Sequence, residues 1–135
     1  MKNRITRVFY VEMAHRLNGH EGKCEHLHGH SYRVEVSVSG PLDSLGRVVD
    51  FSDLKVGIGG WLMNNLDHGT TLSETDPLVA VLEPTKTKLY VMPEPPTAEN
   101  IARLIASETA RLHPTVAVDC VRVWETEHGM AEWVP

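Results

Sequence analysis

Strict alternation between residues 32 and 38 is the feature that most constrains how this chain folds. Apolar side chains occupy every second position from Tyr32 to Val38, with arginine, glutamate and serine between them. Successive side chains of a strand point to opposite faces, so the pattern predicts a strand with one face buried. A weaker alternation over residues 5–14 predicts a second strand that leads into His15.

Two helices and two more strands are predicted downstream, with the helices on either side of a proline-rich insertion. Ser52 is a suitable N-cap for a helix over residues 54–66, although three glycines lie inside it. Thr97 is the expected N-cap of a second helix, which ends before Pro114 because the residue before proline disfavours helix. The other predicted elements are a short strand at 88–92 within the insertion of residues 69–96 and a last strand at 116–124 with a bulge near Cys120–Val121. This order is typical of an α+β domain with an antiparallel sheet.

Composition is consistent with one cytoplasmic domain, residues 1–135. Its 135 residues, 41% of them hydrophobic, are enough to bury a single core. No apolar run approaches the ~20 residues of a membrane span, and residues 1–15 lack the apolar segment of a signal peptide. A net charge of −5 without a basic stripe argues against a nucleic-acid partner. Two cysteines do not make a disulfide framework, so a reducing cytoplasm is expected.

Residues 24–30, CEHLHGH, concentrate a thiol and three imidazoles within seven positions. Strand residues two apart point to the same face, so His26, His28 and His30 offer two overlapping pairs of ligands for one ion. Catalytic zinc commonly takes three protein ligands and leaves a fourth position open. His15, at the end of the first strand, is the natural third donor, and His20 in the following loop is its rival. An isolated histidine is usually a surface or core residue, but this arrangement favours a metal site.

Cys24 and the Asp67–His68 pair are the candidate acid–base groups. Cys24 lies in a polar loop beside Lys23 and near the expected cation, and both neighbours favour the thiolate, the form that acts as base or nucleophile. Cys120 is interpreted as an ordinary buried residue. Taken alone, a histidine at a helix end is unremarkable, because imidazolium interacts well with the helix dipole. Asp67 can orient that ring only if the backbone turns, since adjacent helical residues do not face each other.

Several short motifs occur along the chain in the order found in one enzyme family. They are FYVEMAHRL (9–17), KCEHLHGHSYRVEV (23–36), GRVVDFSDLK (46–55), LDH (66–68), PTAENIA (96–102) and VWETEHG (123–129). Together they resemble the 6-pyruvoyltetrahydropterin synthase / 6-carboxytetrahydropterin synthase family over nearly the whole chain. The resemblance implies the tunnelling fold (T-fold), with a four-stranded antiparallel sheet and two helices on one face. It also implies trimeric barrels stacked as a homohexamer, with active sites between subunits, which would satisfy the exposed sheet edges.

The resemblance also implies roles for individual residues. His15, His28 and His30 become the ligands of Zn²⁺, and His26 is left out as a neighbour. Cys24 becomes the general base, and the pair formed by Asp67 and His68 becomes a proton relay.

Two further positions concern the pterin ring. By resemblance, the Glu125 carboxylate anchors the ring by accepting hydrogen bonds from its 2-amino group and N3–H. Thr97 is a weaker candidate for ring contact, because its role as a helix cap is at least as good an account of it.

The function implied is a zinc-dependent lyase that converts 7,8-dihydroneopterin triphosphate to 6-carboxy-5,6,7,8-tetrahydropterin, acetaldehyde and triphosphate, in queuosine-type biosynthesis. The spacing Cys-x-x-x-His-x-His resembles the bacterial carboxy-forming branch. One alternative is 6-pyruvoyltetrahydropterin synthase, which eliminates triphosphate without carbon–carbon cleavage. Another is a non-catalytic zinc- or pterin-binding protein of the same fold. A cysteine hydrolase is a weaker rival, because it leaves the histidines without a purpose.

Two departures from the family pattern stand beside this resemblance. Val11 and Met13 replace the aromatic residue and the alanine usual in the first strand, and the segment 69–95 is longer than in compact members. The cations that would hold the triphosphate are open, with Arg16, Lys23 and Lys55 suggested by proximity to the motifs.

Overall fold

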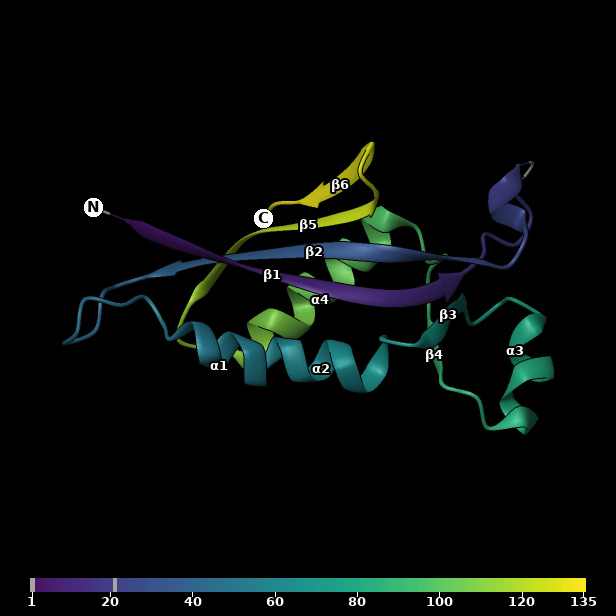
Figure 1. Ribbon diagram of the computed structural model, residues 1–135, viewed down its shortest axis with the longest axis horizontal. Helices are drawn as coiled ribbons and strands as arrows, with labels where there is room; N and C mark the ends of the chain where they lie inside the picture. Colours follow the sequence, from purple (N-terminus) through teal and green to yellow (C-terminus); the bar gives the residue numbers. More distant parts are fainter. Residues whose placement is uncertain (1, 21) are drawn as a thin grey trace.

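The computed structural model describes residues 2–20 and 22–135 of the chain (Figure 1). Its elements, in chain order, are β1 (Asn3–His15), the 3₁₀ turn η1 (Lys23–Glu25), β2 (His28–Gly40), α1 (Phe51–Val56), α2 (Ile58–Asn65), β3 (Gly69–Ser73), α3 (Leu78–Leu82), the 3₁₀ turn η2 (Glu83–Thr85), β4 (Leu89–Met92), α4 (Ala98–Leu112), β5 (Ala117–Thr126) and β6 (Gly129–Trp133).

The strands form one mixed sheet that is larger than predicted. Within residues 2–20 and 22–135 it has six strands in the order β4-β3-β1-β2-β5-β6, rather than four. The two long strands, β1 and β2, pair antiparallel along their whole length, and β5 and β6 continue antiparallel beyond β2. On the other side, β3 runs parallel to the end of β1, and β4 runs parallel to β3. The prediction of a purely antiparallel, four-stranded sheet was therefore wrong, because the insertion and the C-terminal segment each add strands.

The predicted bulge in the last strand is present, slightly earlier than expected. The pairing of β2 with β5 shifts between Ser37 and Val38, whose partners are Cys120 and Val118. Asp119 is therefore the extra residue, and the alternation of β5 changes phase at that point. Sequence pattern alone placed this change at Cys120–Val121.

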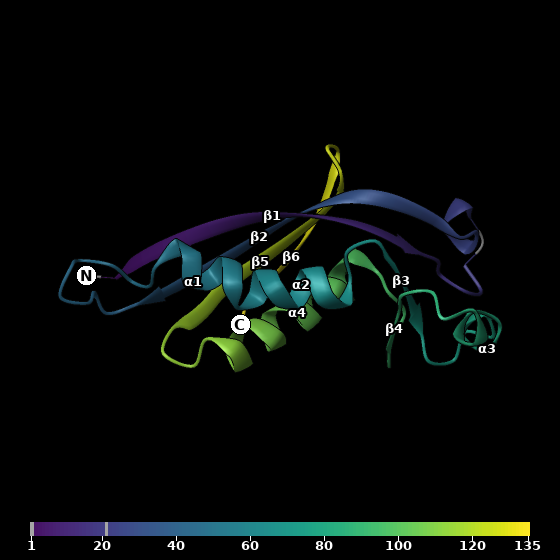
Figure 2. The same cartoon turned by 60° about the horizontal axis from the view of Figure 1, so that its bottom comes forward.

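Helices α1, α2 and α4 cover one face of the curved sheet (Figure 2). The core lies between this face and the helices, and its fully buried members include Val36, Val38, Leu54, Ile58 and Leu62. This confirms an α+β arrangement with helices on one face. None of the helices in the described part of the chain is both long and apolar enough to cross a membrane.

The helix predicted over residues 54–66 is divided at Gly57 into α1 and α2. The N–H of Ile58 donates to Nε2 of His113 at 3.1 Å, so a side chain enters the helical hydrogen-bond ladder there. A Cβ at Gly57 would collide with the His113 ring, and one at Gly59 would lie 2.8 Å from Cε1 of Phe9. These two glycines are therefore explained by close packing. The cap is Asp50 rather than Ser52, because its side chain accepts from the Ser52 N–H.

The insertion holds more regular structure than the single strand that was predicted. Its strand is confirmed as β4, but β3 and the short helix α3 were missed. The β3 strand begins at Gly69, after a short turn that follows the end of α2 at Asn65, and pairs with only the last residues of β1, Met13 to His15. This pairing places the insertion beside the end of β1 that carries the candidate metal ligand (Figure 1).

Candidate metal centre and active site

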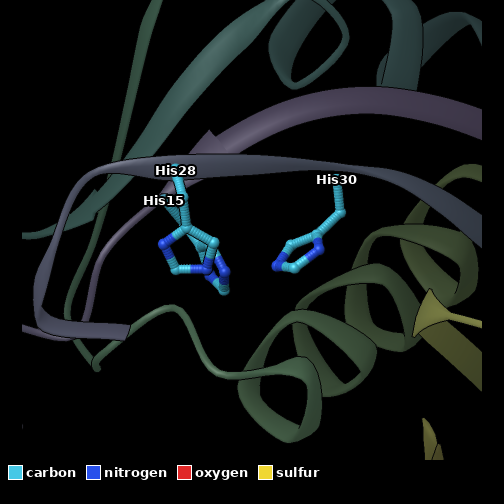
Figure 3. A group of neighbouring side chains, drawn as sticks. All are labelled: His15, His28 and His30. Carbon is cyan, nitrogen blue, oxygen red and sulfur yellow. The ribbon is translucent and has the colours of Figure 1, made fainter. Parts of the chain in front are cut away.

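Three histidine side chains meet where β1 ends and β2 begins. His15 pairs with His28 across the two strands, and His30 lies two residues farther along β2 on the same face. Their candidate ligand nitrogens all lie within 4.8 Å of one another. Figure 3 shows the three rings on the same side of the β1–β2 pair. Residues 28–30 belong to the strand itself, which is why the His-x-His spacing presents both rings to one face.

Backbone carbonyls fix the tautomers of two of these rings. Nδ1 of His15 lies 2.8 Å from the carbonyl oxygen of Pro96, and Nδ1 of His28 lies 2.7 Å from that of His26. A carbonyl oxygen only accepts hydrogen bonds, so each Nδ1 carries the proton and each Nε2 keeps a lone pair. A carbonyl behind an imidazole is a common outer partner of a metal-binding histidine.

The remaining nitrogens have unmet hydrogen-bonding capacity. Nε2 of His15 and Nε2 of His30 are buried and have no hydrogen-bond partner among residues 2–20 and 22–135. Burial lowers the pKa of both His15 and His30, which favours the neutral ring that a metal requires. Converging neutral imidazoles with free lone pairs fit a divalent ion of the zinc type.

The predicted rivals for this position lie outside the group. His20 and His26 are both exposed. The carbonyl of His26 acts only as the partner of the His28 ring. Of the four histidines weighed with His15 from the sequence, the structure therefore brings His28 and His30 to it and leaves these two aside.

Asp67 and His68 form a hydrogen-bonded pair despite being adjacent in sequence. Nδ1 of His68 lies 2.7 Å from Oδ2 of Asp67, and Oδ1 of Asp67 accepts from the N–H of Glu12 at 2.9 Å. The backbone turn that such a pair requires is present, because His68 has φ 59°, in the left-handed region. Burial raises the pKa of Asp67, but the hydrogen bonds from Glu12 and His68 outweigh it and lower that pKa overall.

His68 faces away from the protein interior. Its side chain is 78% exposed, and it lines a shallow pocket of 490 Å³ together with Glu12, Ser31 and Thr70. Glu12 lies three positions before His15 and Ser31 one position after His30, and an odd separation along a strand places both side chains on the face opposite the histidines.

Cys24 is half-buried in the turn η1, in the loop between β1 and β2. Its carbonyl accepts from the N–H of Leu17 at 2.7 Å, which closes the loop just after His15. In the part of the chain that the structure describes, no hydrogen bond or ion pair joins the thiol to Asp67 or His68. The candidate relay therefore lies away from the histidine cluster, and the described residues give it no hydrogen bond or ion pair with the candidate base.

Glu125 lies at the end of β5 and faces the histidine cluster. Its two carboxylate oxygens are 3.9 Å from Nε2 of His15 and 3.9 Å from Nε2 of His30, and its side chain is 30% exposed. It also lines a pocket of 210 Å³ between the start of α4 and the β5–β6 hairpin, beside Glu99. Thr97 is confirmed as the cap of α4, since its hydroxyl accepts from the Asn100 N–H at 3.1 Å.

Comparison with known proteins settles the family. The family model of 6-pyruvoyl tetrahydropterin synthase matches residues 4–134. The chain belongs to this family. It is 33% identical to the 6-carboxy-5,6,7,8-tetrahydropterin synthase of Haemophilus influenzae, an alignment that covers 96% of this chain and 97% of the relative.

Solved structures of this fold superpose closely. A protein from Wolinella succinogenes matches with a TM-score of 0.85 at 23% identity, covering 99% of this chain and 98% of its own. The 6-pyruvoyl tetrahydropterin synthase of Caenorhabditis elegans matches with a TM-score of 0.75 at 24% identity, covering 100% of this chain and 96% of its own. The predicted family is confirmed, and so is its α+β fold, although the sheet is mixed and larger than predicted.

Two residues that contact the predicted site of this synthase-family chain were not predicted from the sequence. The carbonyl of Pro96 orients His15, although only Thr97 was singled out from that motif. Asp76, in the insertion, forms a bidentate ion pair with Arg16, which had been suggested as a triphosphate ligand. The proline before a predicted cap could have pointed to a free carbonyl, but no local pattern marks a buried aspartate in a polar insertion.

Proposed function

We propose that this chain is a zinc-dependent 6-carboxy-5,6,7,8-tetrahydropterin synthase, folded as one domain over residues 1–135. It would convert 7,8-dihydroneopterin triphosphate to 6-carboxy-5,6,7,8-tetrahydropterin, acetaldehyde and triphosphate. The observation that carries the proposal is the convergence of His15, His28 and His30, with free lone pairs, in a chain of this family. Near full-length similarity to a carboxy-forming relative supports the choice of product.

His15, His28 and His30 would hold the zinc ion through their Nε2 atoms. When bound, zinc supplies Lewis-acid polarisation of the hydroxyl oxygens on the substrate side chain. The Pro96 and His26 carbonyls keep the His15 and His28 rings in the tautomer that leaves Nε2 free. Burial lowers the pKa of His15 and of His30, so these two ligands need lose no proton on binding at neutral pH.

Cys24 is proposed as the base that removes a proton from the side-chain carbon next to the ring. It lies in the loop that directly connects the two ligand-bearing strands, and the Leu17–Cys24 hydrogen bond holds that loop closed. His68 is proposed to return protons, with Asp67 holding its Nδ1–H so that Nε2 is presented to solvent.

Glu125 is proposed to anchor the pterin ring. A carboxylate accepts two parallel hydrogen bonds, which suits the 2-amino group and N3–H edge of a pterin. Its position between the histidines and the pocket beside α4 supports a ring seated there with its side chain directed toward the metal ligands.

An assembly of subunits is proposed because one chain does not complete the site. The His68 ring is largely exposed and has no hydrogen bond or ion pair to Cys24 among the described residues, and β4 and β6 leave two open sheet edges. Trimeric barrels paired as a homohexamer would cover the edges and bring the His68 of one subunit to the thiol of another. A monomeric form is therefore expected to bind zinc but not to turn over substrate.

The deciding experiment is mass spectrometry of the products formed from 7,8-dihydroneopterin triphosphate by zinc-loaded protein. The proposal requires 6-carboxytetrahydropterin and acetaldehyde. Formation of 6-pyruvoyltetrahydropterin would keep the site but overturn the choice of product. Untouched substrate in the presence of bound zinc would leave a binding protein rather than a lyase.

A cysteine pair provides the matched control for this experiment. Cys24→Ala is expected to abolish turnover while zinc content stays at the level of the unmodified protein. Cys120→Ala is expected to retain turnover, because that residue is buried in β5 outside the cluster. Loss of zinc in the Cys24 variant would contradict the division of roles proposed here.

A further inference from the structure

An ion pair between a partly exposed arginine and a buried aspartate connects the insertion to the residue that follows β1. Nε of Arg16 donates to Oδ2 of Asp76 at 2.8 Å, and Nη2 of Arg16 donates to Oδ1 of the same carboxylate. Asp76 is only 3% exposed. Two parallel bonds between a guanidinium and a carboxylate fix direction as well as distance, so this contact restrains the orientation of Arg16.

Asp76 is itself held firmly at the end of β3. Its N–H donates to the Ser73 carbonyl at 3.0 Å, and its own carbonyl accepts from Val79 at 3.1 Å. Oδ1 also accepts from the Leu78 N–H at 2.8 Å, at the start of α3. The Arg16 guanidinium lowers the pKa of this carboxyl group, as an ion pair with a buried partner should. The insertion thus presents a fixed anion to Arg16.

In the chain, Arg16 lies between His15, a candidate metal ligand, and Leu17, which bonds to the turn that carries Cys24. The residue before it, His15, is a candidate metal ligand whose ring bonds to Pro96 at 2.8 Å. The residue after it, Leu17, bonds through its N–H to the carbonyl of Cys24 at 2.7 Å. The three consecutive residues 15–17 therefore connect the metal ligands, the insertion and the thiol-bearing turn.

We propose that Arg16 and Asp76 are positioning residues, whose ion pair sets the angle at which the loop leaves β1 and so restrains the turn that carries Cys24 through the Leu17–Cys24 hydrogen bond. This assigns a task to the insertion and means that Arg16 does not bind the triphosphate, since its guanidinium is committed to Asp76. The importance of Cys24 rests on the proposed function, but the restraint on the loop does not.

The test compares Asp76→Asn with the unmodified zinc-loaded protein. Asparagine keeps the size of the side chain and an acceptor for the Leu78 N–H, but it removes the charge that Arg16 requires. Hydrogen exchange of the Leu17 amide is expected to become at least about tenfold faster, because the Leu17–Cys24 bond opens more often. Iodoacetamide should alkylate Cys24, identified by peptide mapping, several-fold faster, and kcat should fall by up to about 10²-fold with KM nearly unchanged.

Asp43→Asn is the matched control. Asp43 also pairs with an arginine, Arg47, at 2.9 Å, but that pair is exposed and lies in the loop after β2. Exchange at Leu17, alkylation of Cys24 and turnover are all expected to stay at the unmodified level in this variant. Arg16→Lys is the second variant if Asp76→Asn fails to fold, and a weaker change in the same direction is expected because lysine keeps the charge but not the two-bond geometry.

Three outcomes would overturn the proposal. If hydrogen exchange at Leu17 and alkylation of Cys24 stay unchanged and only the Tm falls, the ion pair only stabilises the packing of the insertion. A raised KM with unchanged kcat would mean that the pair acts on substrate binding. Loss of zinc would mean that it serves the metal ligands. If the unmodified protein turns over no pterin triphosphate, the proposed function fails, whereas exchange and alkylation still test the restraint on the loop.

Discussion

Two buried histidines, His15 and His113, have similar surroundings and different uses. Their exposed fractions are 1% and 8%, and burial lowers the pKa of each. At His113, Nε2 accepts from the Ile58 N–H at 3.1 Å, and the ring fills the space left by Gly57. At His15, Nδ1 bonds to the Pro96 carbonyl, but Nε2 has no partner in the described part of the chain and converges with two other rings.

Among the described residues, an unpartnered ring nitrogen, rather than burial, distinguishes His15 from His113. Burial and a lowered pKa are common to both, so neither property distinguishes a ligand from a structural residue. An unsatisfied buried acceptor costs about 1–3 kcal/mol, and that cost is absent at His113. Where β1 ends and β2 begins, Nε2 atoms without hydrogen-bond partners in the described part of the chain converge, and a single bound cation would accept their lone pairs together.

The largest expected effect is loss of zinc from the triad. His28→Ala removes a half-buried ligand at the start of β2 and should weaken zinc binding by more than about 100-fold, beyond the cost of losing an outer partner. His113→Gln should leave the zinc stoichiometry unchanged. Metal analysis of both purified variants makes the comparison, and equal zinc content in the two would place the metal elsewhere.

Gly57→Ala should have the next largest effect. We expect it to lower the stability of the fold without changing zinc binding. The added Cβ would collide with the His113 ring, so either the ring or the helix junction must move and the Ile58 bond is strained. We expect the free energy of unfolding to fall by about 2–4 kcal/mol. Denaturant unfolding measures this loss. Gly60→Ala is the control, because nothing lies within 4 Å of a Cβ built there.

The titration of His113 should appear in the pH dependence of stability. Its folded pKa lies below the ordinary value of about 6.5, so the unfolded chain binds more protons in acid. Its contribution is therefore complete above about pH 6.5 and is lost as pH falls toward the folded pKa. The unmodified protein should lose up to about 1.4 kcal/mol per pH unit more than His113→Gln in this window. Parallel curves for the two proteins would show that His113 does not titrate on unfolding.

The sequence predicted those parts of the fold that local pattern specifies. The alternation at Tyr32–Val38 identified β2, and the N-cap pattern at Thr97 identified α4, because both signals depend on residues near each other in the chain. It did not predict β3 or β6, which are short and gain their hydrogen bonds from strands elsewhere. The break at Gly57 could not be predicted either, since it depends on His113, 56 positions away.

The histidine cluster was predictable from sequence for a similar reason, because its signals are local. The spacing of His28 and His30 is local, and the antiparallel pairing of two predicted strands was enough to suggest His15. Parity gave His26 the same standing, the family resemblance left it out, and the structure places it exposed in the turn before β2. Asp76 was not predicted, because its contact with Arg16 depends on how β3 docks beside β1.

Substitution of Tyr32 should have the smallest effect. This residue is buried beside the histidine cluster, and burial alone does not show whether its hydroxyl has a structural role, like His113, or belongs to the site, like His15. Its hydroxyl is buried without a partner among residues 2–20 and 22–135. Its ring lies edge-on to the rings of His15 and His30, with centroid separations of 5.8 and 5.3 Å. Tyr32→Phe keeps the ring and removes the unmet hydroxyl, so we expect unfolding to become about 1 kcal/mol harder with zinc content unchanged. A less stable variant, or one that loses zinc, would show that the hydroxyl belongs with the Nε2 atoms of the triad. The same burial would then conceal a fourth polar group that serves the site.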